Sequence, residues 1–197
     1  MEQPQIKIAI ILGSVRPKNN TAKAVLIVRD ELSNHPYIDV SIIDPGKIDL
    51  PLPGLPGDQN VVKNMQKLVS ESAGVILATP EYHGSYSSVI KLVIDNLGFP
   101  SALKGKPVAL LGVAAGKIGA IKALESLRSI CSHVGSIVLP GAISIANVNS
   151  VFDADGSCNN PAIENQIRSV ATNLINYVSQ RVCPKTDLEE IVRSEAL

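Results

Sequence analysis

Residues 6–33 read IKIAIILGSVRPKNNTAKAVLIVRDELS, and this stretch joins a short apolar run to a segment with helical periodicity. The run at 6–12 is almost entirely aliphatic, which is typical of a strand buried on both faces of a parallel sheet. The segment at 13–20 that follows is mostly polar, cationic, Gly or Pro. A surface turn between a strand and a helix needs only a Gly and one capping residue, so this longer loop predicts a binding site.

The rest of the chain repeats the same alternation of short apolar runs and longer amphipathic segments. This pattern predicts an α/β fold in which helices cover both faces of a doubly wound, five-stranded parallel sheet. Ligands bind such sheets beyond the carboxyl ends of the strands, where the winding direction reverses. The expected strands are 6–12, 38–43, 74–79, 107–113 and 136–139, with an extension at 142–146, and the expected helices are 21–33, 61–72, 87–97, 119–134 and 161–181.

Length, charge and hydropathy limit the classes of function. The 197 residues, 45% hydrophobic and 18% charged, suit one compact domain. We expect residues 1–183 to form that domain and residues 184–197 to form a C-terminal arm. Because 18 basic residues balance 18 acidic ones, no overall field favours nucleic acid, an anionic membrane or a highly charged protein. A small-molecule partner is therefore expected.

The cysteines and the hydropathy profile indicate a cytoplasmic protein with no membrane span. Cys131, Cys158 and Cys183 are far apart, odd in number and without a CxxC pair, which favours free thiols in a reducing compartment. The first residues, MEQPQIK, lack the features of a signal peptide. No run approaches the roughly 20 apolar residues that span a bilayer.

The first loop, GSVRPKNNT at 13–21, has the composition of a phosphate cradle. Gly13 permits a tight exit from the strand, and the N–H groups at the start of the next helix point outward to bind an anion. Ser14, Asn19, Asn20 and Thr21 add hydroxyls and amides, and Arg16 adds positive charge. The loop lacks both GK[ST] and GxGxxG, so the triphosphate and dinucleotide fingerprints are absent. The alternative is that Asn20 or Thr21 only caps the helix while Arg16 is a solvated turn residue.

Two later loops have features that suit a flat ligand. In ATPEYHGSYSS, at 78–88, Pro80 is expected to end the strand, and Tyr82 and His83 offer planar side chains. The alternative for His83 is an exposed loop histidine. In GVAAGKIGA, at 112–120, three glycines with two alanines between the first two leave the backbone bare. That loop could equally be a Gly-rich turn required for close helix packing.

Together these loops resemble the NADPH-dependent FMN reductase family of the flavodoxin-like superfamily, which includes related quinone and azo-dye reductases. The resemblance rests on GSVR followed by NNT, on PEYHGSYSSVIKLVID and on GVAAGKIGA followed by LR, and it extends weakly to VFDADG. It implies a flavodoxin-like fold that binds FMN and accepts electrons from NADPH or NADH. It also implies an FMN phosphate held by Ser14, Arg16, Asn19, Asn20 and Thr21, a flavin ring over Pro80, Glu81, Tyr82, His83, Gly84 and Ser85, and Ala115, Gly116 and Lys117 on the other side.

The sequence departs from the family pattern at two places. Asn19 occupies a position where many relatives carry Ser, and Ala114 and Ala115 occupy positions where Ser or Thr is common. These differences concern individual hydrogen bonds to the cofactor rather than the existence of the site.

The mechanism implied by the resemblance places the chemistry on the cofactor. Flavin N5 accepts a hydride from the nicotinamide, and the electrons then pass to free flavin, a quinone or an azo compound. No side chain is expected to act as a catalytic residue, and neither GxSxG nor HExxH occurs. Two alternatives are an electron-carrying flavodoxin, which the neutral charge disfavours, and a flavin-binding regulator without turnover, which stays open.

The segment at 87–97 also predicts self-association. It is apolar at six positions, more than one helix face is expected to bury against its own sheet. We therefore expect a homodimer, pairing further into a homotetramer, in which a second chain completes the nicotinamide pocket. The alternative is that the last helix covers these side chains within one chain. The six apolar residues are Val89, Ile90, Leu92, Val93, Ile94 and Leu97.

Overall fold

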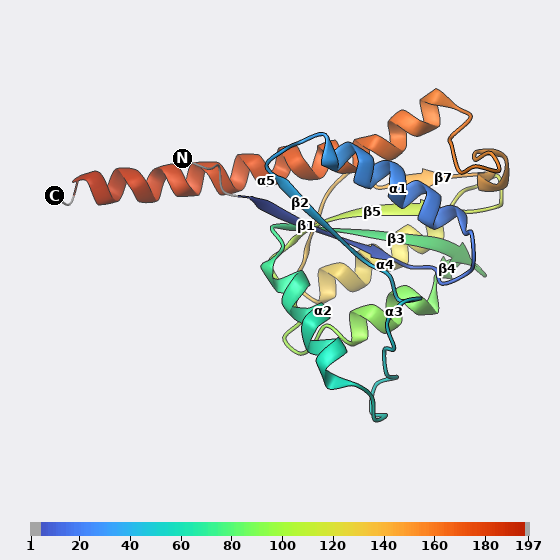
Figure 1. Ribbon diagram of the computed structural model, residues 1–197, viewed down its shortest axis with the longest axis horizontal. Coiled ribbons are helices and arrows are strands. Elements are labelled where there is room, and N and C mark those ends of the chain that lie inside the picture. The colour runs from blue at the N-terminus through green and yellow to red at the C-terminus, as the bar shows by residue number, and fades with distance from the viewer. Residues whose placement is uncertain (1–4, 196–197) are drawn as a thin grey trace.

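The computed structural model describes the backbone of residues 5–195 and the side chains of residues 5–180. The fold is built on one mostly parallel sheet with the strand order β2-β1-β3-β5-β6, which is the doubly wound order of flavodoxin-like proteins. This confirms the predicted fold class (Figure 1). The strands on this path are β1 (Ile6–Leu12), β2 (Ile38–Ile43), β3 (Gly74–Tyr82), β5 (Pro107–Val113) and β6 (Ile137–Val138).

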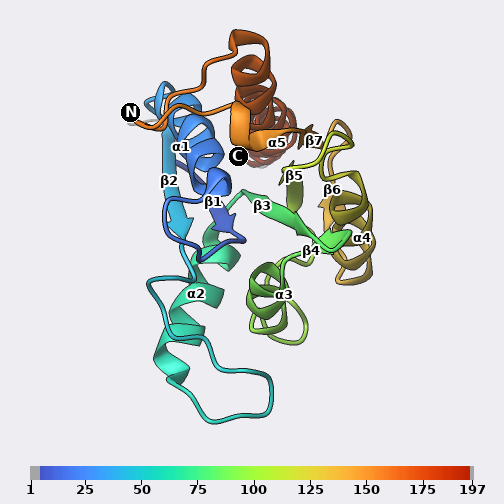
Figure 2. The same cartoon turned by 90° about the vertical axis from the view of Figure 1, so that its right-hand side faces the viewer.

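Two layers of helices bury the two faces of the sheet, as Figure 2 shows. One hydrophobic cluster lies between the sheet and the pair α1 (Asn20–Ser33) and α5 (Pro161–Glu195). A second lies between the opposite face and α2 (Gln59–Glu71), α3 (Ser88–Asp95) and α4 (Ile121–His133). The buried positions of the central strands are almost all apolar, because these strands are covered on both sides.

The ends of two strands differ from the prediction. Pro80 does not stop β3, because its Cα is in register with Val113 of β5 and the strand continues to Tyr82. There it turns back into β4 (Ser85–Tyr86), which pairs with it antiparallel. The expected fifth strand is split into β6, beside the start of β5, and β7 (Ile143–Ile145), beside its end.

The last helix is longer than expected. α5 does not end at Arg181 but continues to Glu195, and Figure 1 shows its second half extending beyond the sheet. The side chains of the predicted arm at 184–197 lie outside the described residues. So does the side chain of Cys183, while Cys131 and Cys158 are free thiols. Burial raises the pKa of the Cys131 thiol to about 12, so this thiol stays protonated at neutral pH.

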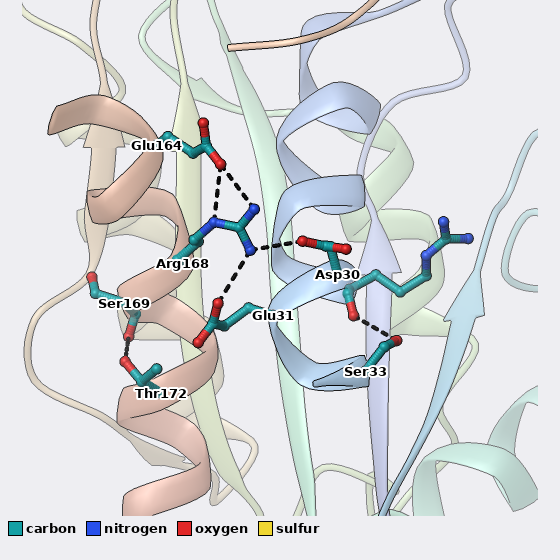
Figure 3. Close-up of polar contacts among 8 residues, drawn as sticks. Asp30, Glu31, Ser33, Glu164, Arg168, Ser169 and Thr172 are labelled. Carbon is teal, nitrogen blue, oxygen red and sulfur yellow. Dashed lines mark hydrogen bonds and ion pairs between the residues drawn. The ribbon is translucent and has the colours of Figure 1, made fainter. Parts of the chain in front are cut away.

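An arginine links the two helices on the first face (Figure 3). Arg168 on α5 donates from Nη1 to Asp30 Oδ2 of α1 at 2.8 Å and to Glu31 Oε2 at 3.1 Å. Its Nε and Nη2 bind Glu164 Oε1 on its own helix at 3.0 and 2.8 Å. One guanidinium thus joins three carboxylates and fixes α5 against α1, whose amino end carries the first candidate loop.

The apolar residues of α3 are not left as an external patch. Ile90, Val93, Ile94 and Leu97 are buried against the chain's own sheet and helices, while Val89 and Leu92 are half-buried. The argument for self-association from this helix is therefore wrong, because α2, α4 and the segment around Leu103 enclose most of it. Among the described residues, no helix is both long and apolar enough to cross a membrane.

Candidate functional site

The loop between β1 and α1 begins with a close approach of two strands. Gly13 donates its N–H to the carbonyl oxygen of Ala78 on β3 at 2.7 Å. A Cβ at position 13 would lie 2.6 Å from that same oxygen. Only glycine fits here, and the fit brings the end of β1 against the end of β3.

Ser14 is buried without a hydrogen-bond partner. Its exposed fraction is 2%, and its Oγ contacts no donor or acceptor among the described residues. Leaving a buried hydroxyl unsatisfied costs about 1–3 kcal/mol, and such groups often mark a ligand that completes the site. Ser14 therefore points to a polar ligand atom at the amino end of α1.

The first turn of α1, at the end of the same loop, supplies backbone donors. The helix begins at Asn20, so the N–H groups of Asn20 and Thr21 have no acceptor within it. Asn19 is the cap: its Oδ1 accepts from the N–H of Ala22 at 2.7 Å, and its Nδ2 donates to the Arg16 carbonyl at 2.7 Å. Both polar atoms of the Asn19 side chain are therefore engaged in shaping the loop. The residue that caps α1 is therefore Asn19, and not Asn20 or Thr21 as the capping alternative proposed.

The remaining side chains of the loop differ in their contacts. Asn20 donates from Nδ2 to Asn149 Oδ1 at 3.1 Å, which ties the start of α1 to the segment after β7. Thr21 is buried, and Arg16 is exposed. The Arg16 guanidinium carbon lies 4.6 Å from the centre of the Tyr82 ring, so the first loop reaches the second.

The predicted ring platform is a tight β-hairpin. Tyr82 pairs with Ser85, and the two residues between them, His83 and Gly84, have φ values of 51° and 72°. Positive φ at both central positions defines a type I′ turn, the connection that best matches strand twist. His83 is exposed at its tip, as its alternative interpretation proposed. Glu81 accepts from the N–H of Ala123 in α4 at 3.0 Å, so its carboxylate anchors the hairpin.

Ser87 joins the first loop to the hairpin, although the sequence analysis did not select it. Its Oγ donates to the Gly13 carbonyl at 2.5 Å and accepts from the N–H of Ile90 at 3.1 Å. Its own N–H donates to Thr79 Oγ1 at 3.1 Å. The serines before VIKLV are enough to predict a helix cap. The bond from Ser87 to Gly13 could not be predicted in this way, because it joins residues 74 positions apart in the sequence.

The loop between β5 and α4 leaves its backbone uncovered. Ala115, Gly116 and Lys117 are exposed, and a Cβ at Gly116 would meet no atom within 4 Å. At the end of this loop Gly119 has φ of 79° and packs against Ser144. Gly119 is therefore required for close packing, as the alternative interpretation of this loop proposed. Gly116 instead borders open space that a ligand could occupy.

All three loops follow the carboxyl ends of β1, β3 and β5, at the edge that faces the viewer in Figure 2. A phosphate would suit the first loop, which offers an unpartnered hydroxyl, free N–H groups at the start of α1 and an exposed cation. A planar group beside it would suit the β3–β4 hairpin and the uncovered backbone of the β5–α4 loop. The residues present therefore fit FMN. Fold and site together define a flavodoxin-like protein of the FMN-binding class.

Comparison with protein families identifies the group within that class. The model of the NADPH-dependent FMN reductase family matches residues 6–150. The chain belongs to this family, and it is a flavin oxidoreductase that uses FMN and takes electrons from NAD(P)H. The family resemblance, enzyme class and cofactor expected from the sequence are confirmed.

Individual relatives agree with this placement. An NADPH azoreductase from Bacillus sp. (strain OY1-2) is 28% identical over 177 residues, which is 87% of this chain and 94% of the relative. An FMN-dependent NADPH-azoreductase from Staphylococcus aureus is 27% identical over 181 residues, 86% of this chain and 94% of the relative. FerB, a flavoenzyme NAD(P)H:(acceptor) oxidoreductase from Paracoccus denitrificans, shares the fold, with a TM-score of 0.76, 22% identity and coverage of 89% and 98%.

Proposed function

We propose that this protein oxidises NADPH or NADH in the cytoplasm and passes the electrons through FMN to a small acceptor, namely a quinone, an azo compound or free flavin. Residues 1–183 would form the single domain that carries this activity. The observation that carries the proposal is the buried Ser14 hydroxyl without a partner, because it lies where a phosphate would meet the first turn of α1. The azoreductase names of two relatives support the choice of acceptor.

We assign the phosphate of FMN to the β1–α1 loop. Ser14 Oγ, the Arg16 guanidinium and the N–H groups of Asn20 and Thr21 would bind it, with Asn19 holding the loop in shape. Charge-assisted hydrogen bonds of this kind contribute about 1.5–3 kcal/mol each. The flavin ring would lie over residues 80–85, with Ala115, Gly116 and Lys117 on its other side.

Bound FMN would supply the chemistry of the reaction, which is to accept a hydride from the nicotinamide and to pass on electrons. The chain's own residues bind, orient and shield it. Backbone N–H groups after Glu81, together with His83 or Lys117, would stabilise negative charge on the ring, and the hairpin that Glu81 anchors would cover part of it. No side chain is assigned a proton-transfer step.

Turnover with defined acceptors tests the proposed function. We expect the freshly purified protein to show a flavin absorbance band, and to oxidise NADPH or NADH when FMN and either a naphthoquinone or methyl red are present. Omission of FMN from flavin-depleted protein should abolish the rate. Flavin binding without oxidation of either nucleotide would instead identify a carrier or a regulator.

Replacing Arg16 by Ala should weaken FMN binding without unfolding the protein. Loss of one charged hydrogen bond to phosphate corresponds to about 1.5–3 kcal/mol, or about a 10- to 150-fold higher dissociation constant. Fluorescence titration of flavin-depleted protein measures it. Arg29→Ala is the matched control, because Arg29 is an exposed arginine on the second half of α1. Equal effects of the two substitutions would contradict a phosphate contact by Arg16.

We also propose that the protein is a homodimer, with a homotetramer as the higher assembly, and that the second chain helps to enclose the nicotinamide. Since most of α3 is buried in its own chain, we propose that the two chains meet through the exposed surface that follows the end of α3. Phe99 is fully exposed there. It lines a groove of about 950 Å³ between the end of α3 and α4.

Light scattering at micromolar concentration checks the assembly. We expect a mass of at least twice the 20.8 kDa of one chain. Phe99→Lys should shift the mass toward one chain and lower turnover, because an ammonium is disfavoured in an apolar contact. Leu55→Lys, in another exposed loop, is the control. A wild-type mass of one chain with full activity would refute the shared pocket.

A further inference from the structure

The contact between Arg16 and Tyr82 links the two halves of the candidate site. Arg16 follows β1 and Tyr82 ends β3, and the guanidinium carbon lies 4.6 Å from the centre of the phenol ring. This distance is within the roughly 6 Å over which a cation is attracted to an aromatic face. The contact is therefore an attractive one between the proposed phosphate loop and the proposed ring platform.

Tyr82 is the side-chain partner that the structure gives to the Arg16 guanidinium. Across residues 5–180, no carboxylate forms an ion pair with it and no carbonyl accepts from it. An exposed arginine otherwise loses rotamer entropy when it binds a phosphate. A side chain already held near its binding position loses less of that entropy on binding.

The geometry of the contact leaves the hydrogen-bonding groups of Arg16 available. Stacking uses the flat face of the guanidinium, whereas its five N–H groups lie in the plane and point outward. A planar fork held by its face can still bind two phosphate oxygens through its edge. Contact with the Tyr82 ring and binding of a phosphate are thus compatible for the Arg16 side chain.

Tyr82 itself is held in place by the hairpin. It pairs with Ser85 across the type I′ turn, and the neighbouring Glu81 carboxylate is bonded to the N–H of Ala123 at 3.0 Å. The Arg16 backbone is fixed as well, because its carbonyl accepts from Asn19 Nδ2 at 2.7 Å. Two anchored elements thus confine one otherwise flexible side chain.

We infer that Tyr82 is a positioning residue that holds the Arg16 guanidinium for the phosphate, and that it thereby sets the preference of the site for FMN over riboflavin. The inference rests on the proposed function, which places the phosphate in the β1–α1 loop. On this inference the Tyr82 side chain serves the phosphate, and the flavin ring would lie over the backbone of residues 80–85 rather than against the Tyr82 ring.

Titration of flavin-depleted protein with FMN and with riboflavin, followed by flavin fluorescence, tests the inference. Tyr82→Leu should raise the dissociation constant of FMN about three- to tenfold, in line with a partly desolvated cation–π contact. The dissociation constant of riboflavin, which has no phosphate, should stay within a factor of two. Tyr82→Phe keeps the aromatic face and should restore the wild-type preference. If Tyr82→Leu lowers the melting temperature, Tyr82→Val at the same strand position replaces it.

The double variant Arg16→Ala/Tyr82→Leu separates the possible failures. In the Arg16→Ala background, the loss of Tyr82 should have no further effect on the ratio of the two constants. If Arg16→Ala alone leaves this ratio unchanged, the phosphate assignment in the proposed function is wrong. If Arg16→Ala lowers the preference and Tyr82→Leu does not, only the positioning role is wrong. An equal loss of both flavins on Tyr82→Leu would make Tyr82 a contact of the ring instead.

Discussion

Replacing Ser14 by Ala is expected to stabilise the flavin-free protein while weakening its binding of FMN. The Ser14 hydroxyl is buried and unpaired, so removing it relieves an unsatisfied polar group, by up to about 1 kcal/mol. The same change removes a donor to the phosphate and should raise the FMN dissociation constant about 10- to 150-fold. Opposite effects on stability and binding are characteristic of a residue kept for its ligand.

Thermal melts and flavin titrations of the same preparations measure both effects. A gain of up to 1 kcal/mol corresponds to about 2–4 °C for a chain of this size. Ser136→Ala is the matched control, because Ser136 Oγ is the other buried hydroxyl without a partner among the described residues and lies near the amino end of β6. The control should change stability alone. A Ser14→Ala protein with unaltered FMN affinity would remove the main support for the phosphate assignment.

Replacing Gly13 by Ala is expected to destabilise the protein by about 2–4 kcal/mol, since overpacking a buried close contact forces the backbone apart. The new Cβ would lie 2.6 Å from the Ala78 carbonyl oxygen and 3.2 Å from Ile90 Cβ. Both neighbours are buried, and the Ala78 oxygen already accepts from the Gly13 N–H. The shift would also move the Gly13 carbonyl, which holds Ser87, so FMN binding should fall together with stability.

The melting temperature should drop by about 5–15 °C, which differential scanning calorimetry resolves. Gly116→Ala is the control for the loss of a loop glycine. Its Cβ would meet nothing within 4 Å, so its stability should stay within about 0.5 kcal/mol of wild type. If Gly13→Ala were as stable as Gly116→Ala, the close approach of β1 and β3 would not be a determinant of this fold.

Much of the fold could be predicted because its determinants are local. The apolar runs at 6–12, 38–43 and 107–113 became strands with those bounds, since burial on both faces of a parallel sheet requires continuous aliphatic sequence. Helical periodicity located five helices to within a few residues at all but one end. Family motifs in the three loops placed the candidate site at the carboxyl edge of the sheet.

The prediction failed where pairing partners lie far apart in the sequence. Pro80 is a strand breaker by local rules, but pairing with β5 and the β4 hairpin carry the strand through it. The apolar surplus of α3 resembled an interface, yet side chains from α2 and α4 bury it. Asn19 and Asn20 are equally suitable caps by sequence, and only the position where α1 begins identifies Asn19 as the cap.

The sequence by itself determined the class of fold, the family and the region of the flavin site, because composition, periodicity and short motifs are properties of neighbouring residues. Only the tertiary structure decided which contacts each candidate site residue makes within the chain. Ser14 is buried without a partner, and the bond from Ser87 to Gly13 and the contact of Arg16 with the Tyr82 ring join residues from separate loops. Those contacts exist because the sheet brings the ends of β1 and β3 together, and no local pattern encodes that distance.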